Sequence, residues 1–214
     1  MRELALGTSD SFPERTIVIT FDDGFANNLD AVDALITRGM TATWFIVTSA
    51  IGRRPHWEDA GRPPGSMLSA EDLRQMDASG MEIGSHTVSH VRLPEVSDTA
   101  LASELNDSKR TLEDLLGKPV ESFAYPYGTW NEHCEDAVER AGYRQACTTQ
   151  TGAALKDGNR YRLRRLAVFN HDTAGSLARK LVLMTNEGGW GHMLAYYGRR
   201  LAGHVFRPED RTGR

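Results

Sequence analysis

The sequence is poor in the features that define several specialised classes of protein. It has only 2 cysteines among 214 residues, Cys134 and Cys147, and their separation matches no metal-binding spacing. A fold held together by disulfides needs more cysteines than this, so we expect two half-buried thiols. No apolar run approaches the ~20 residues of a membrane span. The first residues also lack the long apolar stretch of a signal peptide, which leads us to expect a cytoplasmic protein.

An excess of charge of one sign is also missing. The 25 Lys and Arg residues nearly balance the 29 Asp and Glu residues, and the formal net charge is −4. A surface that binds nucleic acid or anionic lipid is usually basic, so neither partner is predicted. Hydrophobic residues make up 40% of the chain and charged residues 25%, as in a globular protein with a substantial core. No internal repeat or linker divides the chain, so we predict one domain, residues 1–214.

Segments typical of strands alternate along the chain with segments typical of helices. The expected strands are residues 16–21, 41–47, 81–84, 120–125, 144–149 and 162–169. The expected helices are residues 29–36, a helix that begins at Ser69, and residues 98–116, 131–141, 173–185 and 191–201, followed by a polar tail from residue 207. This alternation predicts an α/β fold, either an open wound sheet or a barrel. A complete eight-unit barrel usually needs ~250 residues, so a barrel built from this chain is expected to be shortened or irregular.

Three clusters of polar or aromatic residues directly follow predicted strands, where parallel α/β folds place their ligands. They are Asp-Asp-Gly at 22–24, His-Thr-Val-Ser-His at 86–90 and Tyr-Pro-Tyr-Gly at 125–128. Two histidines four residues apart, with one carboxylate, can hold a metal and leave positions open for water and substrate. Two adjacent carboxylates are costly to bury unless a positive charge lies beside them, and a divalent metal supplies that charge. Each cluster alone is explained equally well by a turn or by polar loop residues; their combination favours a metal site.

These segments together resemble the motifs of the polysaccharide deacetylases, the carbohydrate esterases with a NodB-type domain. Thr-Phe-Asp-Asp-Gly at 20–24 and Ser-His-Thr-Val-Ser-His at 85–90 resemble the first two motifs of that family. Phe-Ala-Tyr-Pro-Tyr-Gly at 123–128 resembles the third. Arg-Leu-Arg-Arg-Leu-Ala-Val at 162–168 is similar to the fourth motif of the exopolysaccharide-deacetylase branch. The resemblance covers about residues 16–168, in the order of the family.

The resemblance implies a distorted, incomplete (β/α) barrel of the NodB-homology type. It also implies a hydrolase that removes the N-acetyl group of an amino sugar, most often N-acetylglucosamine within a glycan. Such an enzyme would carry a divalent metal, most often Zn²⁺, with Co²⁺ or Ni²⁺ as alternatives. By matched position, the metal ligands would be Asp23, His86 and His90.

The resemblance also assigns roles to the other motif residues. Asp22 would be the general base that activates metal-bound water, and the backbone around Tyr127 would help to stabilise the oxyanion. Arg165 would orient or charge-balance Asp22, with Arg164 as the neighbouring candidate, because strand alternation lets only one of the two face the site. The candidate substrate contacts are Tyr125, Pro126 and Trp130.

Two departures from the family pattern affect this interpretation. The third motif of the family commonly begins with arginine, and Ala124 stands at that position. The late Leu-x-His motif, which supplies the general acid, is absent. The general acid would then be a water molecule, Asp22 returning its proton, or one of the histidines His171, His192 and His204. These departures keep a second hypothesis open, that of a non-catalytic or weakly active sugar-binding homologue of the same fold.

Two other kinds of enzyme fit the residues less well. An iron(II) oxygenase also uses two histidines and a carboxylate, but such enzymes usually have an all-β jelly roll, and no His-x-Asp pair is present. An enzyme of Mg²⁺-dependent phosphoryl transfer would need an Asp-x-Asp pair or a phosphate-binding loop that contains a lysine. The segment with Thr48 and Ser49 supplies neither. The sequence leaves the sugar, its chain length and the oligomeric state open.

Overall fold

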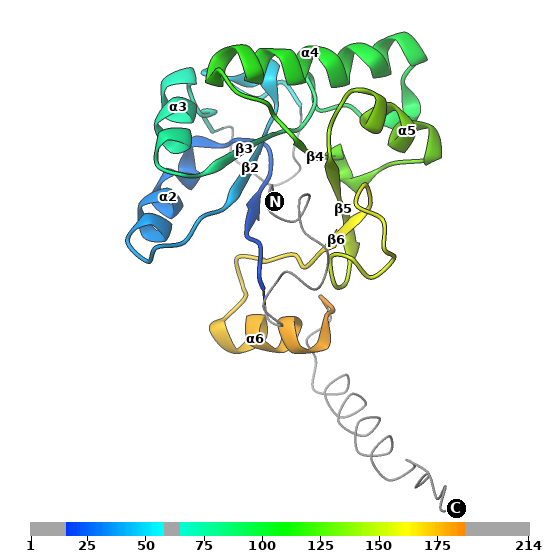
Figure 1. Ribbon diagram of the computed structural model, residues 1–214. Helices are drawn as coiled ribbons and strands as arrows, with labels where there is room; N and C mark the ends of the chain where they lie inside the picture. Colours follow the sequence, from blue (N-terminus) through cyan, green and yellow to red (C-terminus); the bar gives the residue numbers. More distant parts are fainter. Residues whose placement is uncertain (1–15, 58–64, 187–214) are drawn as a thin grey trace, which may run out of the picture. The chain divides into compact units, whose positions relative to one another are not determined.

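The computed structural model describes residues 16–57 and 65–186, and it contains each strand and helix predicted within them. The strands are β1 (Thr20–Phe21), β2 (Thr43–Ile46), β3 (Glu82–Ser85), β4 (Ser122–Ala124), β5 (Gln145–Thr151) and β6 (Leu163–Arg165). The helices are α2 (Leu29–Ile36), α3 (Ala70–Ala78), α4 (Asp98–Leu116), α5 (Glu132–Arg140) and α6 (Ala174–Leu183), as labelled in Figure 1. The helix expected at residues 191–201 and the tail from residue 207 lie outside the described residues.

The strands form one sheet in which neighbours in the chain are neighbours in the sheet. Its order is β1-β2-β3-β4-β5-β6, and each pair from β1 to β5 is parallel. A doubly wound sheet reverses its strand order part-way, whereas a (β/α) barrel continues in one direction. Six strands in sequential order therefore give the incomplete (β/α) barrel that was predicted.

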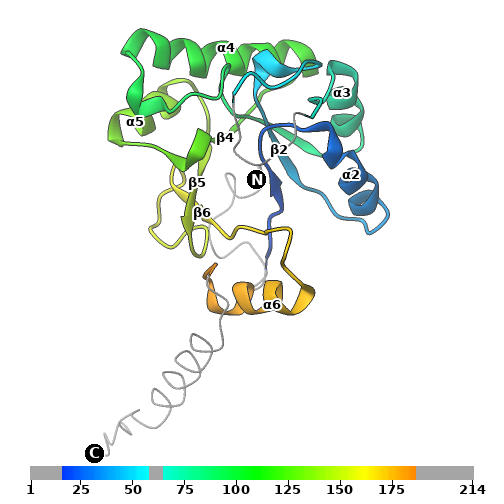
Figure 2. The ribbon, with the colours of Figure 1, turned by 180° about the vertical axis from the view of Figure 1, so that it is seen from behind.

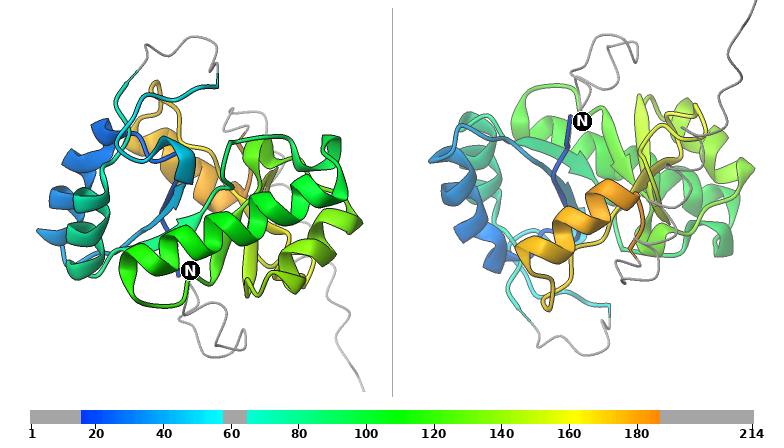
Figure 3. Two further views of the ribbon diagram at one scale, coloured as in Figure 1. Left: turned by 90° about the horizontal axis from the view of Figure 1, so that it is seen from above. Right: turned by 90° about the horizontal axis from the view of Figure 1, so that it is seen from below.

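The contacts divide the chain into two compact units. The first contains residues 1–148 and 155–163, and the second contains residues 149–154 and 164–214. One domain over residues 1–214 stays a prediction. In the first unit, α2 to α5 lie along one face of the sheet, with α3 beside α4 and α4 beside α5 (Figures 2 and 3). Within the described ranges, no helix is both long enough and apolar enough to cross a lipid bilayer.

The core of the first unit lies between the sheet and these helices. The Trp44 ring is fully buried and stacks on Phe21 with 4.6 Å between ring centroids. Helix α4 turns Leu101, Leu105 and Leu112 into this core, and burying each such side chain contributes roughly 1.5–3 kcal/mol. The two cysteines form no disulfide, as expected, but both are fully buried in the core rather than half-buried.

The ends of the helices follow from local sequence. Ser69 and Asp72 form a reciprocal capping box that begins α3, because each side chain accepts a hydrogen bond from the backbone N–H of the other. Gly117 ends α4 with φ 67°, a conformation that glycine adopts without the steric cost of a side chain. Such caps contribute about 1 kcal/mol each and fix where a helix begins or ends.

Two strands are shorter than the composition predicts. The β-rich segment 16–21 contributes only Thr20 and Phe21 to the sheet, since only these pair with Thr43 and Trp44. The segment predicted as a strand up to residue 169 ends its strand at Arg165, and Val168 and Phe169 are exposed at 67% and 47%. Strand propensity reports how well side chains fit a pleated surface, and it does not say where partners are available.

The described part of the second unit is organised around a buried cation. Lys180 of α6 is buried and donates hydrogen bonds to the carbonyl of Ala167 and to the carboxylate of Asp172. A buried ammonium group is costly unless it is paired in this way. Lys180 therefore ties α6 to the segment that precedes it.

Gly84 of β3 provides a test of the packing around the sheet. A Cβ atom added there would lie 2.7 Å from two ring atoms of Phe45 and 3.0 Å from the carbonyl oxygen of Ser122. We expect Gly84→Ala to lower the free energy of unfolding by about 1–3 kcal/mol, measured by urea denaturation. The matched control is Gly175→Ala in the first turn of α6, where the nearest atom would be 3.7 Å away and no destabilisation is expected. An unchanged denaturation midpoint for Gly84→Ala would contradict this packing.

Candidate metal site

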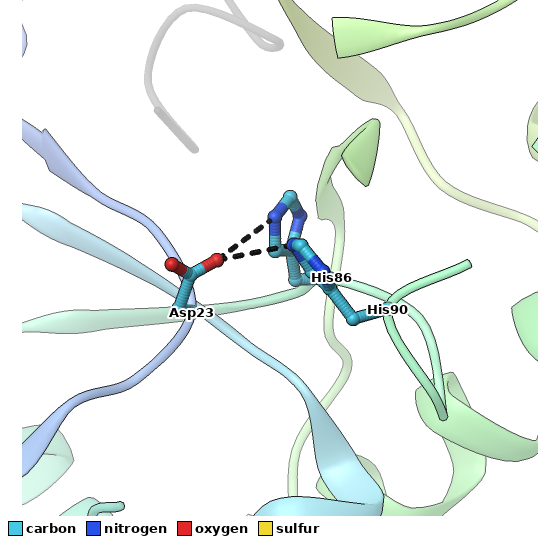
Figure 4. Close-up of side chains that lie close together, drawn as sticks. All are labelled: Asp23, His86 and His90. Atoms are coloured by element: carbon cyan, nitrogen blue, oxygen red, sulfur yellow. Dashed lines mark ion pairs between the residues drawn. The ribbon is translucent and has the colours of Figure 1, made fainter. Parts of the chain in front are cut away.

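The three side chains predicted to bind a metal come together in the first unit, at the carboxyl ends of the strands. Asp23 follows β1 after one residue, and His86 directly follows β3. His90 lies on the same loop four residues after His86. One ligand atom from each of the three lies within 4.8 Å of the others. Figure 4 shows the Asp23 carboxylate facing both imidazole rings.

The distances between the donor atoms suit a small divalent metal. Oδ1 of Asp23 is 3.4 Å from Nε2 of His86 and 3.2 Å from Nε2 of His90. Two ligand atoms that are each ~2.1 Å from a tetrahedral zinc ion lie about 3.4 Å apart. Carboxylate oxygen and imidazole nitrogen are also ligands that zinc takes. The residues present therefore fit the metal that the family resemblance implies.

A backbone contact sets the orientation of the His86 ring. Nδ1 of His86 lies 2.7 Å from the carbonyl oxygen of Ala124 at the end of β4. Because a carbonyl can only accept, Nδ1 donates in this contact, which leaves Nε2, 3.4 Å from Oδ1 of Asp23, as the ring nitrogen that would bind a metal. A histidine binds a metal through one ring nitrogen while the other donates a hydrogen bond, and the contact with Ala124 fixes which nitrogen does which. Ala124 thus contributes its backbone to the site, while its side chain is fully buried.

Asp23 is held in its ionised form. Burial raises the pKa of its carboxyl group, but hydrogen bonds from His86 and His90 and the charges of the two rings outweigh burial and bring the pKa well below its usual range. A carboxyl group must be deprotonated to bind a metal. At neutral pH Asp23 is therefore already in its binding state.

The backbone around the site is held in unusual conformations. In the described part of the chain, five residues other than glycine have positive φ. Four of them are here: Asp23 at 73°, Thr87 at 70°, His90 at 58° and Tyr127 at 58°. Such conformations cost about 1–3 kcal/mol each and persist only where the surroundings enforce them. Their concentration here indicates that the orientation of these side chains is maintained at a cost in the free energy of folding.

Aromatic rings enclose His90. The ring of Trp57 stacks on it, with 4.7 Å between centroids and 29° between planes, and the Tyr127 ring lies 4.6 Å away. The guanidinium carbon of Arg92 lies 4.2 Å from the centroid of the Tyr127 ring. His56 Nε2 is 3.1 Å from the carbonyl oxygen of Ser89. The sequence assigned no site role to Arg92, because nothing in its spacing signals its contact with Tyr127, and His56 was considered only as a weaker candidate for the general acid.

The other predicted site residues of the first unit differ from one another in how far they are exposed to solvent. Asp22 is partly buried beside Asp23, and Tyr127 is 42% exposed. Tyr125 is fully buried against Phe123, and burial raises the pKa of its hydroxyl group. Because this ring belongs to the core, its placement argues against a contact with sugar.

The roles of the remaining predicted residues stay predictions. Pro126 is buried and Trp130 is partly buried. The guanidinium carbon of Arg162 lies 4.9 Å from the centroid of the Trp130 ring. Arg165 and His171 belong to the second unit, so their roles stay predictions. The other two histidines considered as general acids, His192 and His204, lie outside the described residues.

Comparison with known proteins identifies the family. Residues 9–146 match the family model described as polysaccharide deacetylase, which is more than half of the chain. The chain belongs to the polysaccharide deacetylase family. The resemblance of the sequence motifs is thereby confirmed.

Two curated relatives show how far this family likeness extends. The chain is 34% identical over 163 residues to YxkH of Bacillus subtilis (strain 168), whose name assigns it to the polysaccharide deacetylases; the match covers 75% of the chain and 54% of YxkH. It is 24% identical over 168 residues to the poly-β-1,6-N-acetyl-D-glucosamine N-deacetylase of Staphylococcus aureus (strain N315), with 73% of the chain and 56% of that enzyme covered. The chain therefore spans about half the length of the curated relatives it matches.

A solved structure supports the fold of this polysaccharide deacetylase domain. The deacetylase PplD of Streptococcus pyogenes, solved in complex with acetate, superimposes with a TM-score of 0.70 at 24% identity. The superposition covers 81% of the chain and 74% of PplD. At this identity the likeness establishes the fold alone, and that fold is the incomplete barrel described above.

The donor set predicts that the protein binds about one divalent transition metal per chain. Asp23→Asn, His86→Ala and His90→Ala each remove one of three ligands, so each should weaken Zn²⁺ binding by at least the ~10–100-fold that losing an outer-shell partner costs. Isothermal titration calorimetry on the metal-stripped protein measures this. His133→Ala is the control, because His133 is an exposed histidine paired with Asp98, and its affinity should be unchanged. No zinc in elemental analysis after reconstitution would contradict the site.

Proposed function

We propose that this polysaccharide deacetylase domain is a metal-dependent hydrolase that removes N-acetyl groups from an amino sugar. The observation that carries the proposal is the convergence of Asp23, His86 and His90 at the strand ends of the family fold. We favour N-acetylglucosamine within a glycan as the substrate. The Staphylococcus aureus relative, named for its action on poly-β-1,6-N-acetyl-D-glucosamine, supports this class of sugar.

Three atoms of the chain would hold the metal: Oδ1 of Asp23 and the Nε2 atoms of His86 and His90. Zinc is our first choice, with Co²⁺ or Ni²⁺ as alternatives. When bound, such a metal lowers the pKa of a coordinated water to roughly 7 and polarises a carbonyl oxygen. An amide needs both effects, because its carbonyl carbon is a poor electrophile and water is a poor nucleophile.

Asp22 is the proposed general base. It adjoins Asp23 in the chain and is partly buried. In this proposal Asp23 is the only one of the two adjacent carboxylates that binds the metal, so the Asp22 carboxylate stays available to take a proton from the attacking water. The C–N bond of the amide then breaks, giving acetate and an amine. The proton taken by Asp22 is available for the leaving nitrogen.

Tyr127 and Arg165 complete the proposed machinery. The backbone N–H of Tyr127 would stabilise negative charge that develops on the carbonyl oxygen. The contact between the Tyr127 and His90 rings, with 4.6 Å between centroids, supports a place for this residue beside the metal ligands. Arg165 would balance the charge of Asp22, and Trp130, which is only partly buried, would contact the sugar.

A sugar-binding homologue without turnover is the second candidate. It is favoured by the fully buried Ala124 side chain, since no arginine charge comes from that position of the third motif. The absent Leu-x-His motif points the same way. The presence of all four residues Asp22, Asp23, His86 and His90 makes the enzyme the stronger proposal.

Acetate release separates the two candidates. The protein reconstituted with Zn²⁺ is incubated with chitin oligomers, poly-N-acetylglucosamine, peptidoglycan fragments and nucleotide-linked amino sugars. We expect a linear release of acetate from at least one of them, abolished by a chelator and restored by added metal. Sugar binding without acetate release from any of the four would instead support the non-catalytic homologue.

The two adjacent carboxylates are distinguished by paired variants. Asp22→Asn is isosteric, so it should keep near-normal Zn²⁺ affinity while kcat falls by at least ~10². Asp23→Asn should weaken metal binding, and excess metal should restore part of its activity. Calorimetry and acetate release are measured on the same samples. Loss of the metal in Asp22→Asn together with its retention in Asp23→Asn would reverse the two assignments.

A further inference from the structure

A carboxylate on helix α4 reaches the loop that carries both histidines. Oε2 of Glu104 accepts hydrogen bonds from the backbone N–H groups of Val88 and Ser89, at 2.8 and 2.9 Å. Its Oε1 accepts from the hydroxyl group of Ser89. All three donors lie between His86 and His90. One side chain from a helix thus holds the centre of this loop.

The position of Glu104 on α4 is unusual for an acid. It is partly buried next to Leu105 and within one turn of Leu101 and Ser108, all of which face the core. A carboxylate placed here loses hydration and requires compensating hydrogen bonds. Among the residues that the structure describes, no Lys or Arg pairs with it, and the loop donors provide these hydrogen bonds instead. These hydrogen bonds of the Glu104 carboxylate therefore all come from residues of this loop.

The loop needs such support because its backbone is strained on both sides of these donors. Thr87 has φ 70° and His90 has φ 58°, and such conformations persist where neighbouring contacts enforce them. The carbonyls of Thr87 and Val88 accept hydrogen bonds from the backbone of residues 48 and 49, and the His90 N–H donates to the Thr87 hydroxyl group. Glu104 fixes the two N–H groups in between.

We propose that Glu104 is a positioning residue of the metal site. By fixing residues 88 and 89, it keeps the Nε2 atoms of His86 and His90 directed at Oδ1 of Asp23. Without its carboxylate the two N–H groups lose their acceptor, the positive φ angles relax, and the two imidazoles no longer converge. This inference rests on the metal site of the proposed function, and it is tested without measuring deacetylation.

The test is metal affinity in a graded set of Glu104 variants. Glu104→Met keeps the length of the side chain but accepts no hydrogen bond, so Zn²⁺ affinity should fall by about 10–100-fold. Glu104→Gln should retain most of the affinity, because the amide oxygen can accept both N–H groups while the amide nitrogen donates to the Ser89 hydroxyl group. The absorption spectrum of bound Co²⁺, which reports ligand geometry, should change in the Met variant and stay like the parent in the Gln variant.

Asp107→Asn is the matched control, since Asp107 is an acid of the same helix that pairs with Arg110. Its affinity and Co²⁺ spectrum should equal those of the parent. If Glu104→Met does not fold, Glu104→Asp replaces it, because the carboxylate is then withdrawn by one methylene and the same direction of change is expected. Parental affinity and spectrum in the Met or Asp variant, with or without lower stability, would overturn the positioning role alone. A parent protein that binds no metal would overturn the proposed function as well.

Discussion

The site depends on one carboxylate held between two imidazoles. Oδ1 of Asp23 lies 3.4 and 3.2 Å from the Nε2 atoms of His86 and His90, in surroundings where burial alone would favour the protonated acid. The two rings reverse that preference and keep Asp23 ionised. The same closeness that stabilises the charge sets the donor separation that a zinc ion needs. The short distances from Asp23 to the two rings therefore determine both the ionisation of Asp23 and the spacing of the metal-binding atoms.

The fold meets this constraint by bringing separate loops to one edge of a parallel sheet. Asp23 follows β1 and His86 follows β3, and the carbonyl that orients His86 ends β4. Strand order alone does not aim these side chains. The positive φ angles at Asp23 and His90 do so, and contacts from outside the motifs accompany them: Trp57 stacks on His90, and α4 supplies Glu104. The stability of the hydrophobic core allows this strain to persist.

Local signals explain why much of the fold could be predicted from the sequence. Helix α4 follows from its leucine stripe and Gly117, and the convergence of Asp23, His86 and His90 follows from adjacent acids and histidines at fixed spacing after predicted strands. Glu104 could not be predicted, because its partners are 15 and 16 residues away and only tertiary packing joins them. The burial of Tyr125 was missed for a related reason, since an aromatic residue at a strand end suits the core and a sugar surface equally well. The short β1 reflects where the partner strand lies, which composition does not report.

X-ray absorption at the zinc edge of the reconstituted protein tests the central claim most directly, because it reports the ligands of the bound metal. The account predicts two imidazole nitrogens at ~2.0–2.1 Å with oxygen ligands at ~2.0–2.2 Å, and loss of one imidazole signal in His90→Ala. It predicts no sulfur ligand, as Cys134 and Cys147 are buried in the core. A sulfur shell at ~2.3 Å, or a zinc environment unchanged by removing His90, would contradict the assignment of Asp23, His86 and His90 as the metal site.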